Sequence, residues 1–180
     1  MVGKKQRALV YYRQAQELVE AHGDRWGEAV VRAGLGAAYF QLGETETAID
    51  HYRSAVELFR NAKVSYGEAA NLLTLGACLA AVGRLDEALA QELRALAIAR
   101  SISDPRLEER VLLGIGQVQA EANRLDEALA SHGRALTLAR SVGDPLGETD
   151  ALNGMGALLH RQGRHLDARS YSSSPNRPAT

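Results

Sequence analysis

The sequence is poor in several features, and each absence narrows the functions open to the chain. A single cysteine, Cys78, excludes an internal disulfide framework. The 21 basic and 22 acidic residues leave a net charge of −1, with no basic stripe for nucleic acid and no acidic tail. No apolar run reaches membrane-spanning length, and the N-terminus lacks a signal-peptide pattern. We therefore expect a soluble, cytoplasmic protein with neither nucleic acid nor membrane as a partner.

What the sequence does contain is a repeat of forty residues. The heptapeptide RLDEALA occurs at 84–90 and again at 124–130. Other positions recur in the same phase, among them Ala8, Ala48, Ala88, Ala128 and Ala168, and also Ala15, Ala55, Ala95 and Ala135. A fixed period of this length indicates a solenoid of stacked supersecondary units, each of which buries its apolar face against its neighbours.

Helical spacing of apolar residues predicts a series of helices separated by turns. The expected helices cover 3–22, 25–42, 44–62, 66–82, 84–102, 105–122 and 124–142, with a last one reaching about 162. The predicted division is a half-repeat 3–24, repeats 25–64, 65–104 and 105–144, a partial repeat 145–171 and an irregular tail 172–180. The tail is expected because Pro175 stands where the repeats carry an alanine, and proline breaks a helix interior.

Capping signals support these boundaries. Carboxylates that can accept from first-turn amides precede three of the helices: Asp24, Asp104 and Asp144. Ser65 and Glu68 have the spacing of a capping box. Asn123 replaces glycine at one turn, and asparagine tolerates the left-handed conformation that such a turn needs.

The repeat resembles the tetratricopeptide repeat. The residues that carry the resemblance are Leu35, Gly36 and Tyr39 in the first helix of a pair, with Ala48, Tyr52 and Ala55 in the second. Later repeats depart from the pattern, since Leu79 and Gln119 replace the first aromatic residue and Glu92 and His132 replace the second. The longer period is similar to that of Pins/LGN-type scaffolds and of the C-terminal arms of bacterial transcriptional regulators. The resemblance spans 4–171 and implies an all-α, right-handed solenoid of antiparallel helix pairs.

Glycines recur inside the first helices, at Gly36, Gly76, Gly116 and Gly156. Glycine in a helix interior costs about 0.5–1 kcal/mol relative to alanine, so a repeated glycine needs a packing reason. We expect each to give room for the close approach of a partner helix. The Gly-x-Gly sequences at 34–36, 114–116 and 154–156 follow no strand and lack a third glycine, so they do not indicate a dinucleotide site.

No group of residues has the pattern of a catalytic, cofactor or metal site. The five histidines form no i, i+4 pair or carboxylate cluster typical of zinc, and His160 and His165 are expected to be solvated. Cys78 lies in an apolar run and is expected to be a small buried residue. Asp86 and Glu87 open a helix, where they oppose its dipole. We therefore predict a protein that is not an enzyme.

The candidate functional surface is the concave groove that the first helices line in a tetratricopeptide solenoid. The positions carried over are Val30, Ala33, Ala37, Phe40, Gln41, Ala70, Leu73, Ala77, Ala80, Arg110, Leu113, Gln117, Asp150, Asn153, His160 and Arg161. The first nine are apolar or uncharged and the rest are mostly polar, which predicts an apolar anchor region with charges that fix direction at the other end. The alternative is that tight curvature hides the alanines.

Three functions fit these observations. The first is a protein-interaction module that takes a peptide or helix of a partner into the groove. The second is self-association, in which a second copy covers the apolar groove or the uncapped ends of the solenoid. The third is an effector-sensing arm of a bacterial regulator. The first is our principal prediction.

Overall fold

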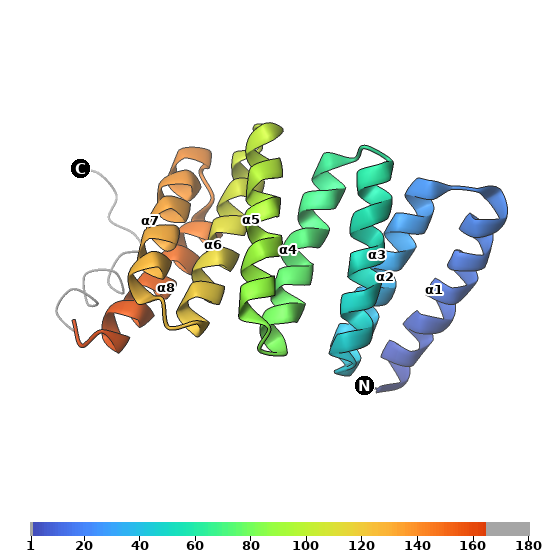
Figure 1. Cartoon of the computed structure of the whole chain (residues 1–180), viewed down its shortest axis with the longest axis horizontal. Helices are drawn as coiled ribbons and strands as arrows, with labels where there is room; N and C mark the ends of the chain where they lie inside the picture. The colour runs from blue at the N-terminus through green and yellow to red at the C-terminus, as the bar shows by residue number, and fades with distance from the viewer. Residues whose placement is uncertain (1, 165–180) are drawn as a thin grey trace. The chain divides into compact units, whose positions relative to one another are not determined.

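The computed structural model describes residues 2–164, and the side chains of residues 6–164 (Figure 1). These residues form eight α-helices and no strand. The helices are α1 (Val2–His22), α2 (Arg25–Leu42), α3 (Thr45–Asn61), α4 (Ser65–Ala81), α5 (Leu85–Ser101), α6 (Pro105–Glu121), α7 (Leu125–Val142) and α8 (Pro145–Arg161). Each predicted boundary lies within one residue of the observed one, so the predicted helices are confirmed. The predicted tail 172–180 and the end of the partial repeat lie outside the described residues.

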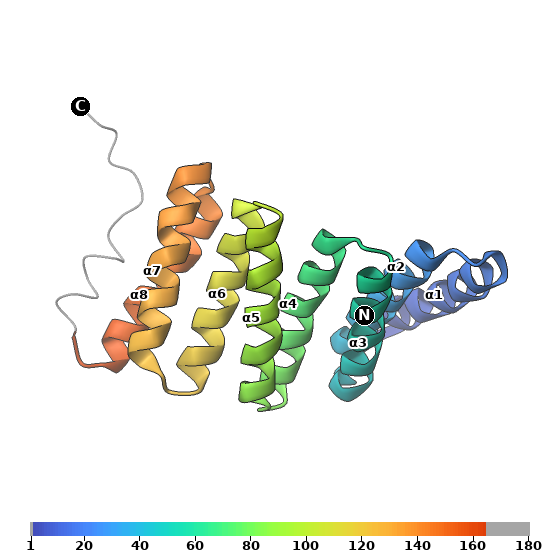
Figure 2. The ribbon, with the colours of Figure 1, turned by 45° about the horizontal axis from the view of Figure 1, so that its top comes forward.

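The chain divides into two compact units, Met1–Ile98 and Ala99–Thr180. In the N-terminal unit α1 packs on α2, α2 on α3 and α3 on α4. In the C-terminal unit α6 packs on α7, and α8 packs on both α7 and α6. Helices that follow each other along the chain therefore lie side by side within a unit, as both views show (Figures 1 and 2). We call α2, α4, α6 and α8 first helices, and α1, α3, α5 and α7 second helices.

Residues in the left-handed conformation end the helices at intervals of twenty positions. Those with positive φ are Gly23, Gly43, Lys63, Gly83, Ser103, Asn123, Gly143 and Gly163. The prediction for Asn123 is confirmed, with a φ of 59°. Lys63 and Ser103 have φ values of 56° and 53°, which an ordinary side chain adopts only at a cost in free energy. The geometry of the turns is therefore set by the repeat, whatever residue occupies the position.

Three of the four predicted helix caps are confirmed, and one prediction is wrong. Asp24 accepts a hydrogen bond from the Gly27 amide, and Asp104 and Asp144 accept from corresponding first-turn amides. Ser65, however, is the first residue inside α4, and the capping position holds Val64, which makes no side-chain cap. The capping box fails because Ser65 stands one residue too late to accept from the orphan amides.

The first-turn glutamates instead form ion pairs with the preceding second helix. In the N-terminal unit the Arg60 guanidinium donates to the Glu68 carboxylate across 2.9 Å. In the C-terminal unit Arg100 donates to Glu108 across 2.7 Å, and Arg140 donates to Glu148 across 2.9 Å. Each pair spans the turn between one helix pair and the next. Such exposed pairs contribute about 0–1 kcal/mol each, so they favour the turn geometry without being the main source of stability.

The expected packing role of the glycines is confirmed where the structure describes their surroundings. A methyl group added at Gly36 would lie 3.0 Å from the Tyr52 ring, and one at Gly76 would lie 2.6 Å from the Glu92 side chain. A second-helix side chain therefore fills the space that a Cβ atom would need. Leu35 and Leu75, next to these glycines, are buried. Close helix contact is thus built into the repeat at the glycine positions.

Candidate interaction surface

The first helix of the N-terminal unit, α2, presents a stripe of apolar side chains to solvent. Its members, which we call the α2 stripe, are Trp26, Val30, Ala33, Ala37 and Phe40. Their spacing alternates between four and three residues, so they lie along one face of the helix. Trp26 is 57% exposed, and Val30 and Phe40 are about 40% exposed, at 41% and 40%. The helix therefore keeps large apolar groups in contact with water.

The corresponding face of α4 repeats the arrangement. The α4 stripe consists of Tyr66, Ala70, Leu73, Ala77 and Ala80. Tyr66 is 51% exposed, Ala77 is exposed, and the other three are half-buried. Large side chains stand at the start and middle of this stripe, and small ones fill the rest. Four of the five stripe alanines are half-buried and Ala77 is exposed, so the alternative that curvature hides the alanines holds in part.

The charged side chains of α2 and α4 are engaged in ion pairs. On α2, Arg25 lies 3.5 Å from Glu28, and Arg32 lies 3.6 Å from Glu20 of α1. The one charged residue of α4, Glu68, pairs with Arg60 in the last turn of α3. Neither stripe itself contains a charged residue.

Two polar side chains of α4 donate to carbonyls of their own helix. The Asn71 amide donates to the Gly67 carbonyl across 2.8 Å, and the Thr74 hydroxyl donates to the Ala70 carbonyl across 3.1 Å. These groups therefore do not require a polar partner from outside. The surface suits an uncharged, apolar contact.

Sequence reasoning missed the two aromatic residues at the start of the stripes, Trp26 and Tyr66. They stand forty residues apart and four residues before Val30 and Ala70. The sequence contained the signals that would have found them, because the repeat period and the helical spacing together place both aromatic residues on the predicted face. The prediction began one helical turn too late.

The C-terminal unit carries the polar part of the predicted set. Arg110 and Gln117 on α6 are exposed, and Leu113 between them is half-buried. On α8, Asp150, Asn153, His160 and Arg161 are all exposed. Gln41, the remaining predicted residue, is exposed at the end of α2. Whether the predicted residues of the two units act on one ligand stays a prediction.

Arg161 is exposed, and its side chain also forms hydrogen bonds to the end of α6 and the turn that follows it. Its guanidinium donates to the Ala120 carbonyl across 2.9 Å and to the Asn123 side-chain oxygen across 3.3 Å. Ala120 is in the last turn of α6, and its carbonyl also accepts from the Asn123 amide across 3.1 Å. Arg161 therefore caps the end of α6 from α8, a role that its place in the sequence did not reveal.

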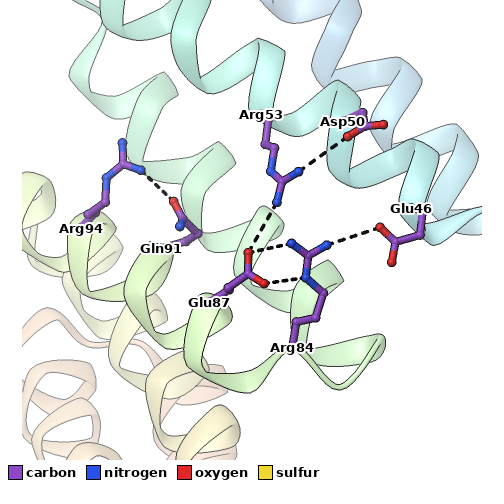
Figure 3. Close-up of polar contacts among 7 residues, drawn as sticks. All are labelled: Glu46, Asp50, Arg53, Arg84, Glu87, Gln91 and Arg94. Carbon is purple, nitrogen blue, oxygen red and sulfur yellow. Dashed lines mark hydrogen bonds and ion pairs between the residues drawn. The ribbon is translucent and has the colours of Figure 1, made fainter.

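A separate group of charged residues joins α3 to α5 in the N-terminal unit (Figure 3). Arg84 donates two hydrogen bonds to Glu87, of 2.7 and 2.6 Å, and lies 3.4 Å from Glu46. Arg53 bridges Asp50 at 3.7 Å and Glu87 at 3.6 Å. The hydrogen bonds from Arg84 hold the pKa of Glu87 below its ordinary value. Because these charges are solvated and mutually paired, the network serves as a surface link between neighbouring second helices.

The remaining candidate residues have structural environments. Cys78 is fully buried, as expected, and burial raises the pKa of its thiol to about 11, which disfavours the reactive thiolate. The ring of His51 stacks on that of Tyr39 at 5.2 Å, and burial lowers the pKa of His51. Within residues 2–164 no group of three or more potential metal-ligating side chains comes together. None of the described helices is long and apolar enough to cross a membrane.

The repeated helix pair, with glycine under the second-helix side chain, is the arrangement expected of one family. The sequence matches the tetratricopeptide repeat family over residues 2–61 and 67–141. The chain belongs to the tetratricopeptide repeat family. Its fold is accordingly that of an all-α helical solenoid. No curated protein matches the sequence significantly.

Solved structures similar to this chain share the helical-repeat fold. BtubC (BKLC) from P. vanneervenii is 18% identical, with a TM-score of 0.81 over 99% of this chain and 80% of that one. Aspartyl phosphate phosphatase F from Bacillus subtilis is 16% identical, with a TM-score of 0.83 over 92% of this chain and 43% of that one. A Rap protein complexed with competence and sporulation factor is 14% identical, with a TM-score of 0.79 over 93% of this chain and 48% of that one. This chain therefore spans less than half of the latter two proteins.

Proposed function

We propose that the chain is a protein-interaction module and that its N-terminal unit binds an apolar peptide or helix of a partner. The observation that carries the proposal is the pair of exposed apolar stripes on α2 and α4, neither of which contains a charge. Exposed apolar surface is unfavourable in water, and a contiguous patch of it is typical of an interaction site. The chemistry of the partner follows from that of the surface. A charge on the contacting face of the partner would lose water and gain no counter-charge.

Large side chains would anchor the partner. Phe40, Leu73 and the two aromatic residues Trp26 and Tyr66 still expose apolar area that a bound segment could cover. Full burial of such a side chain is worth about 1.5–3 kcal/mol, so a few anchors can supply the affinity of a moderate complex. The small alanines between the anchors would let the backbone of the partner approach closely.

The comparisons support binding in a general way. The Rap protein named above was solved in complex with competence and sporulation factor, so this fold can hold a binding partner. Another similar structure is named as a phosphatase, but this chain spans 43% of it. Because both likenesses are below 20% identity, they carry the fold and leave the partner of this chain open. We propose binding, and not catalysis, as its activity.

The proposal can be tested with peptides selected from a random library on the immobilised protein. The affinity of a selected peptide is then measured by fluorescence anisotropy for the wild type and for Leu73→Glu. We expect the substitution to weaken binding at least about tenfold, which corresponds to about 1.4 kcal/mol. Leu93→Glu is the matched control, since Leu93 is 50% exposed and belongs to α5, which carries neither stripe.

Two results would contradict the proposal. One is equal affinity of the wild type and the Leu73→Glu variant for the peptides selected on the wild type. The other is an equal loss of affinity for the Leu73→Glu and Leu93→Glu variants. Circular dichroism of both variants checks that the helices remain intact.

Self-association is a second candidate, favoured by the outer face of α1. Val10, Tyr11 and Leu18 are 54%, 69% and 62% exposed. A second copy could cover these apolar groups. Light scattering of the purified chain over a wide range of concentration would show a dimer or larger species, and Leu18→Glu should return it to a monomer. Leu146→Glu, at a 78% exposed position on α8, is the control. A monomer at all concentrations would exclude this function.

A further inference from the structure

The second helices place one side chain at a repeated position between first helices. On α1 and α3 this position holds tyrosine, with Tyr12 against Gly34 and Tyr52 against Gly36, and on α5 it holds Glu92, against Gly76. Burial and neighbouring groups raise the pKa of Tyr52 to about 12, so it stays neutral at any physiological pH. The ring at this position of α3 therefore does not titrate in that range.

In the C-terminal unit the same position holds His132, on α7. A methyl group at Gly116 of α6 would lie 2.8 Å from its Nε2 atom, and one at Gly154 of α8 would lie 2.6 Å from its Cε1 atom. The imidazole is thus held between two helices and is only 7% exposed. Its Nδ1 atom is buried without a hydrogen-bond partner among the described residues. An ionisable ring on α7 therefore fills the position that tyrosine holds on α1 and α3.

A second buried ionisable group, Glu109, also contacts α8. The carboxylate of Glu109, on α6, occupies the space that a side chain at Gly147 of α8 would need. Glu109 is 1% exposed, and its Oε2 atom has no hydrogen-bond partner in the described part of the chain. The corresponding residues of the earlier repeats, Ala29 and Ala69, are fully buried and apolar. α8 therefore packs on two groups that can each acquire a buried charge.

We propose that these contacts make the docking of α8 sensitive to pH. Protonation of His132 as the pH falls weakens the packing of α8 on α6 and α7. Ionisation of Glu109 as the pH rises weakens this packing as well. A charge in either place would be buried without a counter-charge in contact, which costs free energy that the neutral form does not. Because α8 carries Asp150 and Asn153, a change in its docking would also move this part of the polar surface.

The direction of each effect follows from the surroundings of the two groups. Burial lowers the pKa of His132. No charged side chain shifts this pKa further, including Asp150 on α8 and Glu127 on α7. Neutral His132 therefore makes its full contribution to stability above its ordinary pKa of about 6.5. This contribution is lost as the pH falls through the pKa of His132 in the folded state.

For Glu109 the direction is opposite. Burial raises its pKa, Asp144 and Asp150 raise it further, and Arg110 and Arg106 partly offset this. Its contribution is present in full below about pH 4.3 and is lost as the pH rises through the folded-state pKa. A fall in pH therefore lowers the stability that His132 contributes and raises the stability that Glu109 contributes. Variants at each residue are needed to measure the two effects separately.

The test is amide hydrogen exchange of α8 between pH 5 and pH 7.5, measured by mass spectrometry and corrected for the intrinsic exchange rate. His132→Tyr introduces the residue that α1 and α3 carry at this position. We expect the ratio of α8 protection in His132→Tyr to that in the wild type to rise as the pH falls. The rise is up to tenfold for each unit by which the pKa of His132 is lowered. A ratio that does not change with pH would overturn the role of His132, since a purely structural effect shifts protection equally at all pH values.

Glu109→Ala supplies the matched measurement for the second group. We expect its α8 protection, relative to the wild type, to fall as the pH falls, because the stabilising protonation of Glu109 is lost. A constant ratio would overturn the role of Glu109. His132→Gln repeats the first comparison with a smaller, uncharged side chain. It keeps the test decisive if the tyrosine does not fit between Gly116 and Gly154.

Discussion

Alanine substitution at two glycines of the C-terminal unit tests whether close helix packing explains the glycines of this repeat. Gly154 lies inside α8 and Gly133 inside α7, so both are in helix interiors. They differ in what an added methyl group meets. At Gly154 it would lie 2.6–2.8 Å from three atoms of the His132 ring, whereas at Gly133 no atom lies within 4 Å.

The expected signs are opposite. Alanine gains about 0.5–1 kcal/mol over glycine in a helix interior, and at Gly133 nothing offsets this gain. At Gly154 the methyl group is about 1 Å closer than the optimal carbon contact of 3.5–4.0 Å, so α8 and α7 must separate. Overpacking of this kind costs about 1–3 kcal/mol. We expect Gly154→Ala to be destabilised by a net amount of about 1–2 kcal/mol and Gly133→Ala to be stabilised by about 0.5–1 kcal/mol.

The measurement is urea unfolding followed by circular dichroism, with the slope of the transition checked for each variant. A Gly154→Ala protein as stable as Gly133→Ala would refute the packing explanation. A loss of stability in both variants would also refute it, because a methyl group at Gly133 meets no neighbouring atom and should only stabilise the helix.

Three further predictions concern the helix ends. Lys63→Gly and Ser103→Gly should each raise the free energy of unfolding by about 1 kcal/mol, since both residues are held at positive φ; unchanged melting temperatures would contradict this. Asp104→Ala should cost about 1 kcal/mol while Asp104→Asn costs little, because asparagine also caps; equal losses in urea unfolding would be inconsistent with capping. Arg60→Ala should cost less than about 1 kcal/mol, and the cost should shrink in high salt, so a salt-independent loss would exclude an ion-pair effect.

Most of the helical framework was predictable because its signals are local. Helix starts follow from residues such as Asp104, whose carboxylate reaches amides only three residues away. Helix ends follow from glycine or asparagine at the turns. Where a local signal was read one residue out of register, as at Ser65, the prediction failed. Helical spacing and the repeat period also predicted the face that carries Phe40, which is exposed, and Leu73, which is half-buried.

The sequence by itself determined the class of the fold, the positions of the helices and the glycines at which helices approach. Only the tertiary structure decided which polar residues lose contact with water. Glu109 is buried against α8, and His132 is buried between α6 and α8; neither residue carries that information in its own stretch of sequence. The same holds for Arg161, whose partners lie about forty residues earlier. Burial and long-range pairing depend on contacts across helices, whereas capping and helical spacing depend on neighbours along the chain.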